Sequence, residues 1–287
     1  MSAVSLALVL AAAVLHATWN LFAKRAGDGG TAFVWLCAVT MAALYAPFGL
    51  VVYLVARPDI GLTQLGFMAG SGVLHLCYFT LLQHGYRVGD LSLVYPLARG
   101  TGPMLSTAAA VLILSERPTT LALTGAAFVC AGVIVLGTTS RPSDDRSRAP
   151  AVIFGLLTGG LIAVYTLWDK HAVGTLAVPP ILLDVTANAV RGALLTPSAL
   201  RRKDVVRGVW RHNRREVIGV SLIAPLAYIL VLTALAVSPV SYVAPAREVS
   251  ILVGTIFGVR LLREGHLGPR IAGALAIVGG LAALALG

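Results

Sequence analysis

Residues 92–117 read SLVYPLARGTGPMLSTAAAVLILSER, an apolar run of helix length that contains Arg99 and ends in two charged residues. Residues 241–264 read SYVAPAREVSILVGTIFGVRLLRE and have the same character around Arg247. A shift of 148 positions superimposes the two arginines, together with the glutamates and glycines that follow them. The sequence therefore predicts an internal duplication, in which each copy carries an arginine into an apolar segment.

Apolar residues dominate the whole chain. Of its 287 residues, 57% are hydrophobic and only 12% are charged, whereas about 25% of residues are charged in a typical soluble domain. Too few polar side chains remain to cover a surface facing water, so we expect lipid to surround the protein. Backbone groups in lipid must be paired within helices or a closed barrel, and apolar runs of about 20 residues favour helices. The predicted fold class is an all-α integral membrane protein with about ten transmembrane helices.

Charged and Gly/Pro-rich breaks divide the sequence into these predicted spans. Residues 1–139 form a first five-helix repeat, 140–149 a linker and 150–287 a second five-helix repeat. Because each repeat has an odd number of spans, the second must enter the membrane from the opposite side. This predicts an inverted repeat with its substrate site near the midplane. The predicted spans are 2–23, 31–55, 62–84, 91–115, 118–138, 150–170, 178–197, 216–237, 241–262 and 266–286.

Positive charge is concentrated in the loops after the odd-numbered spans, most of all in residues 201–215, RRKDVVRGVWRHNRR. The positive-inside rule makes these loops cytoplasmic and sends both termini to the other side of the membrane. A net charge of +10 would suggest nucleic acid in a soluble protein, but here topology and anionic lipid headgroups explain it. We therefore predict a multi-pass protein of the cell (inner) membrane that contacts membrane lipid and no nucleic acid.

Arg99 and Arg247 are the first candidates for a functional site. An ionisable group at membrane depth costs about 2.5–3.5 kcal/mol, so it usually faces a partner or a water-filled cavity. One interpretation places two planar, permanently charged guanidinium groups across a central cavity, where they suit a carboxylate or phosphate. The other is a structural pair, bonded to unwound backbone carbonyls or, for Arg247, to Glu248. Neighbouring prolines remove helical hydrogen bonds and predict irregular helix geometry at both arginines. These prolines are Pro96, Pro103 and Pro245.

Other polar side chains within the spans complete the predicted site. His16 and Asn20 lie one helical turn apart on the first span, as do Asp184 and Asn188 on the seventh. Asp184 is either half of a structural ion pair with Arg191 or a proton site, and His16 is either a structural histidine or a proton carrier. The predicted substrate-binding residues are Arg99, Arg247, His16, Asn20, Tyr95, Tyr165, Trp168, Asp184 and Asn188. The candidate proton sites are Asp184, His16 and Glu248.

Glycines recur in the closing span of each half, where small residues allow close helix packing within a half or across a homodimer interface. The motifs GxxxxGK[ST], HExxH and GxSxG, which bind nucleotides or carry out covalent chemistry, do not occur in the sequence. We therefore expect a protein that is not an enzyme and that uses no cofactor and no metal.

Four segments resemble the EamA-type branch of the drug/metabolite transporter superfamily, and the resemblance covers essentially the entire chain. It implies a ten-helix inverted repeat, alternating access and a central cavity lined by helices 1, 3, 4, 6, 8 and 9. Two features depart from the family pattern: the basic loop follows the seventh helix instead of the second, and Arg263-Glu264-Gly265 replaces a full ERL-type motif. The four segments are HATWNLFAK (16–24), LSLVYPLARG (91–100), LSERPTTLALTGAAFVCAGVIVLG (114–137) and LLREGHLGPRIAGALAIVGG (261–280).

These patterns favour a secondary transporter that exports a small organic anion or zwitterion, such as an amino acid. Arg99 and Arg247 would bind its acidic group. An alternative is a flippase for a phosphate-bearing lipid-linked intermediate, which requires a lateral opening between helices. A third interpretation, a membrane scaffold, requires the arginines to be packed against carboxylates with no cavity between them.

Overall fold

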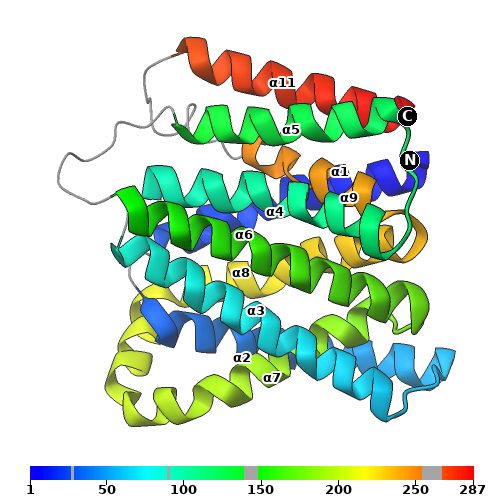
Figure 1. Ribbon diagram of the computed structural model, residues 1–287. Helices are drawn as coiled ribbons and strands as arrows, with labels where there is room; N and C mark the ends of the chain where they lie inside the picture. The colour runs from blue at the N-terminus through cyan, green and yellow to red at the C-terminus, as the bar shows by residue number, and fades with distance from the viewer. Residues whose placement is uncertain (27–28, 89–90, 139–147, 254–266) are drawn as a thin grey trace.

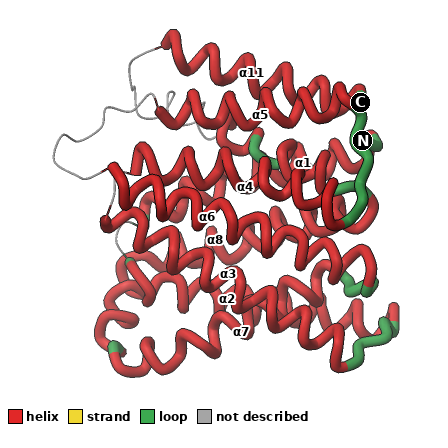
Figure 2. The backbone as a smooth tube through the Cα atoms, viewed as in Figure 1, coloured by secondary structure: helices red, strands yellow, loops and turns green. Residues whose placement is uncertain are grey.

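The computed structural model describes residues 1–26, 29–88, 91–138, 148–253 and 267–287. Over these ranges the chain is helical, with short connections and no strand (Figure 2). The first half contains α1 (Ala3–Arg25), α2 (Gly30–Ala56), α3 (Leu62–Val88), α4 (Leu91–Ile113) and α5 (Thr120–Thr138). The second half contains α6 (Arg148–Lys170), the π-helix η1 (His171–Thr175), α7 (Pro180–Arg201), α8 (Lys203–Val237), α9 (Val240–Ala246) and α11 (Leu267–Leu286).

Each predicted span coincides with a helix, except in two places. The basic stretch expected as a loop is helical, because α8 begins at Lys203 instead of near residue 216. The polar residues and the apolar residues that follow them therefore belong to one long helix. Within it, only Asn213 departs from helical geometry, at φ −118° and ψ 20°. The second place is the ninth span, whose later part, with Arg263, Glu264 and Gly265, lies outside the described residues.

Apolar side chains cover the outside of the bundle. Within the part of the chain that the structure describes, five helices are long and apolar enough to cross a membrane, and residues 120–136 and 271–286 form two shorter apolar helices. Large hydrophobic side chains such as Leu50, Leu112 and Leu275 are exposed on the outer faces of their helices. In water such a surface would be costly, whereas in lipid it is the expected exterior. The protein is therefore an all-helical membrane protein.

The helices lie side by side, and both chain termini are at the same end of the bundle (Figure 1). α5 packs on α11 at one edge, and α2 packs on α7 at the other. Between these pairs, α4 packs on α6 and α9, α3 on α6, and α1 on α8. Contacts between the two halves of the chain therefore extend through the whole bundle.

Glycines hold α5 and α11 together. A Cβ atom on Gly125 would lie 2.6 Å from the carbonyl oxygen of Gly280, and one on Gly132 would lie 2.6 Å from that of Gly273. Any larger residue would therefore meet the backbone of the other helix. The sequence left open whether these glycines pack within a half or across a dimer; in the structure they join the first half of the chain to the second.

The predicted irregularity at the arginines is confirmed for one and wrong for the other. α9 ends at Ala246 with Arg247 as its C-cap, and residues 249–253 are helical again. In contrast, α4 continues unbroken through Pro96, Arg99 and Pro103. α4 packs against α5, α6 and α9, and it stays helical at both of its prolines.

Candidate functional site

Arg99, Arg247 and Glu248 meet in the interior, and we refer to them as the arginine–glutamate cluster. Arg99 Nε lies 3.0 Å from Glu248 Oε2, and Arg247 Nε lies 3.2 Å from Glu248 Oε1. The Glu248 side chain is 1% exposed, and the two arginine side chains are 8% and 10% exposed. One carboxylate therefore serves two guanidinium groups in a setting that excludes most water, where charges interact strongly.

Polar side chains contact the remaining edges of both guanidinium groups. Arg99 Nη2 donates to Ser250 Oγ over 3.5 Å, and Arg247 Nη2 donates to the hydroxyl of Tyr165 over 3.3 Å. The Arg247 guanidinium also lies over the Tyr165 ring, 5.7 Å from its centroid, a distance at which cation–π attraction contributes. The predicted site residue Tyr165 is thus brought to the cluster.

Local backbone geometry explains how the cluster forms. The interruption between α9 and residues 249–253 places Arg247 and Glu248 at a turn, with both side chains directed to the interior. Arg99 is carried by continuous α4 and is followed by Gly100, where a Cβ atom would lie 2.7 Å from Ile134 Cγ1 of α5. α4 can therefore come close to α5 while presenting Arg99 to α9.

A second group of buried polar residues adjoins the cluster through Tyr165. The Tyr165 ring lies 4.4 Å from the ring of His75, centroid to centroid. His75 Nδ1 lies 2.8 Å from the Ser71 carbonyl oxygen, and its Nε2 lies 3.8 Å from Asp169 Oδ2. Tyr228 donates its hydroxyl proton to the same Asp169 oxygen. We refer to Asp169, His75 and Tyr228, from α6, α3 and α8, as the aspartate–histidine site.

The predicted substrate-binding residues and candidate proton sites did not include Asp169, His75 or Tyr228. The Asp169 side chain is 0% exposed. The signal that could have found it is the general cost of an acid within a membrane span, which makes every such acid a candidate.

Asp184, Asn188 and Arg191 form a third polar group, on α7. Asn188 Nδ2 donates to Asp184 Oδ2 over 3.0 Å, and the Arg191 guanidinium donates to Asn188 Oδ1. The asparagine thus lies between the acid and the base that the sequence paired directly. The spacing along the helix was interpreted correctly, since the three side chains share one face.

The other predicted site residues have different surroundings. His16 lies close enough to Arg99 and Arg247 to interact with both electrostatically. Asn20 is exposed, and its amide donates to the His16 carbonyl within α1 over 2.7 Å. Trp168 stacks on Phe67 and donates to its carbonyl over 2.8 Å, so it packs against α3 instead of joining the arginines. Tyr95 belongs to α4, but its side chain lies outside the described residues.

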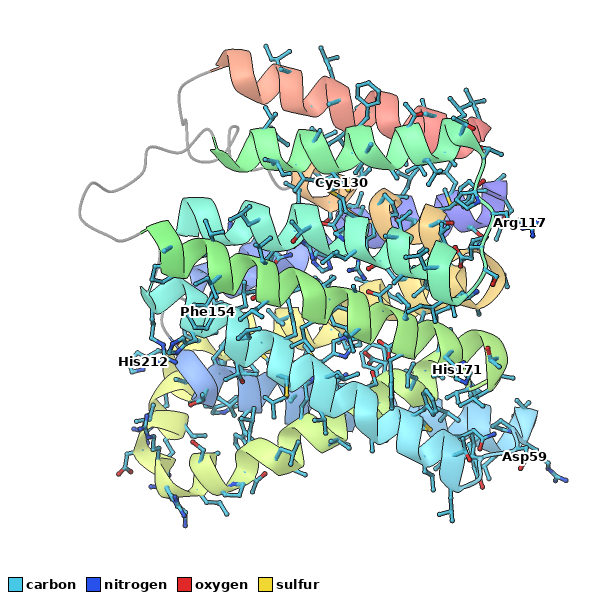
Figure 3. The ribbon with its side chains drawn as sticks, viewed as in Figure 1. Asp59, Arg117, Cys130, Phe154, His171 and His212 are labelled. Atoms are coloured by element: carbon cyan, nitrogen blue, oxygen red, sulfur yellow. The ribbon has the colours of Figure 1, made fainter. Side chains whose placement is uncertain are left out.

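Two cavities lie at the ends of the bundle. One, of about 430 Å³, is lined by Glu116, Lys170 and His171 together with neighbouring apolar residues, and Figure 3 shows His171 at this end. The other, of about 150 Å³, lies at the start of α2, against residues 198–206. Neither of these two cavities is lined by Arg99 or Arg247. The arginine–glutamate cluster is therefore buried away from both. The packing of both arginines against one carboxylate matches the structural-pair alternative, in which Arg247 bonds Glu248, and is the arrangement that a scaffold requires. The predicted central cavity stays a prediction.

Two charged residues beside the larger cavity form hydrogen bonds with backbone groups at the ends of α8 and α9. Glu116 accepts hydrogen bonds from the backbone N–H groups of Val240, over 2.7 Å, and Ser241, over 2.9 Å. Lys170 Nζ donates to the carbonyl oxygens of Leu235 and Ser238, over 2.6 and 3.0 Å. Glu116 belongs to the first half of the chain and supplies acceptors to the start of α9, which would otherwise have unpaired donors.

Comparison with known proteins gives the family and the fold. Residues 3–138 match the EamA-like transporter family. The fold resembles that of a solved structure described as the crystal structure of a protein, with a TM-score of 0.77 and 15% identity, over 100% of this chain and 98% of that chain. Among curated proteins, none matches the sequence significantly. The resemblance drawn from the sequence is thus confirmed over residues 3–138, which match the EamA-like transporter family of the drug/metabolite transporter superfamily.

Proposed function

We propose that the protein is a secondary active transporter that exports a small organic anion or zwitterion, such as an amino acid, across the cell (inner) membrane. The family implies a transporter of the drug/metabolite type, and the buried arginines supply the substrate class. No covalent step is part of this proposal. The solute moves by alternating access, with its acidic group held by Arg99 and Arg247.

The sharing of one carboxylate by two buried guanidinium groups is the observation that carries the proposal. Glu248 lies 3.0 Å from Arg99 Nε and 3.2 Å from Arg247 Nε, so the cluster itself has one positive charge in excess of its negative charge. Excess charge is expensive inside a membrane protein. A carboxylate or phosphate on the solute offsets it, because guanidinium groups bind both in bidentate geometry.

The surroundings of the cluster suit a small polar solute better than a bulky one. The Tyr165 hydroxyl and the Ser250 hydroxyl contact the guanidinium groups, and His16 lies within electrostatic range of both. The cluster is buried, so helix movement has to open it. The two described cavities lie at the ends of the bundle, which favours passage along the helices over the lateral opening that a lipid flippase requires.

Alternating access is supported by a pairing that is preserved when the two halves are exchanged. A shift of 148 positions relates Gly125 to Gly273 and Gly132 to Gly280. Gly125 packs on Gly280, and Gly132 packs on Gly273, so each contact becomes the other under the exchange. Likewise, the contact of α1 with α8 corresponds to that of α6 with α3. We propose that the halves are inverted repeats that open alternately to the two sides.

The motif GxxxxGK[ST] does not occur in the sequence, so we propose that existing gradients drive transport and that the solute gradient is directed outward. A metabolite that accumulates in the cytoplasm moves outward down its own gradient. Binding shifts the inward- and outward-open populations only as far as the solute prefers one of them.

Uptake into proteoliposomes tests the proposal. Vesicles containing the protein are screened with radiolabelled amino acids and phosphorylated metabolites, and wild type is compared with Arg99→Ala and Arg247→Ala. Arg191→Ala is the matched control, since it also removes a guanidinium group from the interior but leaves the cluster intact. We expect uptake to be lost in the first two variants and retained in the control. Wild-type uptake in both cluster variants would exclude the arginines from the site.

A further inference from the structure

The aspartate–histidine site contains two polar atoms whose hydrogen-bonding capacity is unused. Among the described residues, neither Asp169 Oδ1 nor His75 Nε2 has a partner at normal hydrogen-bond geometry, although both atoms are buried and the Ser71 hydroxyl lies near the Asp169 carboxylate. Asp169 is 0% exposed and lies two residues before the first residue of the π-helix η1. A buried carboxylate oxygen without a donor disfavours the charged form, and π-helical turns are frequent at functional sites. These atoms are in place to receive a proton.

We propose that Asp169, with His75 and Tyr228, forms a proton-binding site, and that a proton binds there together with the solute anion held by the arginine–glutamate cluster. This inference rests on the proposed function, because it assigns the coupling ion to that transporter. Export down the solute gradient carries the proton outward with the solute, and an acidic exterior drives the same transporter in the uptake direction. The proton adds to a carboxylate oxygen of Asp169 and leaves from the same atom, so no other bond changes.

Local charge gives the sign of the coupling. Asp169 lies within electrostatic range of Arg247, one of the two arginines proposed to hold the solute anion. A proton on Asp169 removes a negative charge that competes with the solute anion for Arg247. Proton and anion therefore favour each other's binding, and by linkage each raises the affinity for the other to the same extent.

The contacts around Asp169 connect the two sites. Arg247 donates to the Tyr165 hydroxyl, and the Tyr165 ring packs on His75, which faces Asp169. The other charged groups within electrostatic range are Asp184 and Arg191 of α7, which interact with Asp169 and His75 respectively. A proton at Asp169 therefore changes the field at Arg247, to which Asp169 is connected through two intervening side chains, His75 and Tyr165.

Asp184 is a weaker proton site on the same grounds. Its Oδ2 accepts a hydrogen bond from Asn188, which Arg191 holds in place, and hydrogen bonds to the charged form stabilise it. Unlike Asp184, Asp169 is followed directly by two residues, Lys170 and His171, that line the cavity of about 430 Å³. This cavity lies at the end of the bundle that holds both chain termini (Figures 1 and 3). Protons can reach that cavity from outside the bundle.

Two transport modes in proteoliposomes test the inference, with a radiolabelled amino-acid mixture as the probe. Exchange at equal pH, with the same mixture on both sides, needs no net proton movement. Net uptake driven by an acidic exterior does. We expect wild type to perform both, with faster uptake when the outside is acidic. Asn mimics a permanently protonated acid, so Asp169→Asn should keep exchange and lose the response to the pH gradient. Asp204→Asn, the control, removes an exposed acid that pairs with Arg207 and should keep both.

The outcomes separate the two proposals. Absence of exchange in wild type would contradict the proposed function itself, whereas a wild-type pH response in Asp169→Asn would overturn only the proton site. If Asp169→Asn does not insert, Tyr228→Phe decides. Removing the hydroxyl that stabilises the carboxylate should move the pH midpoint of uptake upward by about one unit. An unmoved midpoint in a variant that still exchanges would contradict the inference.

Discussion

Arg99 and Arg247 are related by a shift of 148 positions, yet the two halves of the chain place them differently. α4 continues through Arg99, which is followed by Gly100, whereas α9 ends immediately before Arg247, which is followed by Glu248. Gly100 allows close contact with α5, while Glu248 reaches both guanidinium groups. The first copy thus keeps the close contact between α4 and α5, and the second copy supplies the carboxylate of Glu248. This asymmetry is why two arginines share a single carboxylate.

Removing that carboxylate should have the largest effect. Glu248→Gln leaves two buried guanidinium groups without their shared partner, and breaking a buried ion pair in this way costs about 3–5 kcal/mol. We expect a clearly lower melting temperature of the detergent-solubilised protein. Asp204→Asn is the control, since its ion pair with Arg207 is exposed and should contribute almost nothing. Equal melting temperatures for wild type and Glu248→Gln would contradict the role of Glu248 as the shared partner of both arginines.

Alanine at the glycines between α5 and α11 tests the symmetric part of the molecule. At Gly125 and Gly273 a Cβ atom would meet backbone atoms of the facing helix, which cannot rotate away. Overpacking of this kind costs about 2–3 kcal/mol. If the halves are equivalent here, the two variants should lose similar stability, as measured by thermal unfolding. Gly279→Ala has open space and serves as the control; a large difference between Gly125→Ala and Gly273→Ala would argue against equivalence.

Gly100→Ala tests why the first half has no acid at this position. The added Cβ would lie 2.7 Å from Ile134 Cγ1, but a side chain can shift, so the expected loss is about 1 kcal/mol. Gly160→Ala, where nothing lies within 4 Å, should be neutral or slightly stabilising because alanine favours helix. If Gly100→Ala is as stable as Gly160→Ala, close packing does not explain the glycine.

The smallest expected effect concerns the link from Glu116 to the start of α9. Glu116→Gln keeps one acceptor oxygen and loses the other, so we expect a loss of about 0.5–1 kcal/mol. Hydrogen exchange at the Val240 and Ser241 amides should become faster, since these are the groups that Glu116 pairs. Unchanged exchange at both amides would show that the cap does not hold α9.

The sequence predicted most of the fold because apolar runs and their breaks directly determine where membrane helices begin and end. It also pointed to Arg99, Arg247 and Glu248 together, because the duplication relates the two arginines and Glu248 directly follows Arg247. It did not find the aspartate–histidine site, because His75, Asp169 and Tyr228 come together only through the packing of α3, α6 and α8. The exposure of Asn20 could not be predicted either. Its spacing from His16 is helical, but the sequence does not show how the helix is rotated in the bundle, and the Asn20 side chain is exposed.

The central claim is that Arg99 and Arg247 bind the acidic group of the solute, and equilibrium binding tests it most directly. The dissociation constant of a radiolabelled solute retained from the uptake screen is measured for wild type, Arg99→Gln, Arg247→Gln and the control Arg191→Gln in detergent. A hydrogen bond to a charged group contributes about 1.5–3 kcal/mol. We therefore expect each cluster variant to bind at least about tenfold more weakly, with the control near wild type. Wild-type affinity in Arg99→Gln and Arg247→Gln would contradict the account.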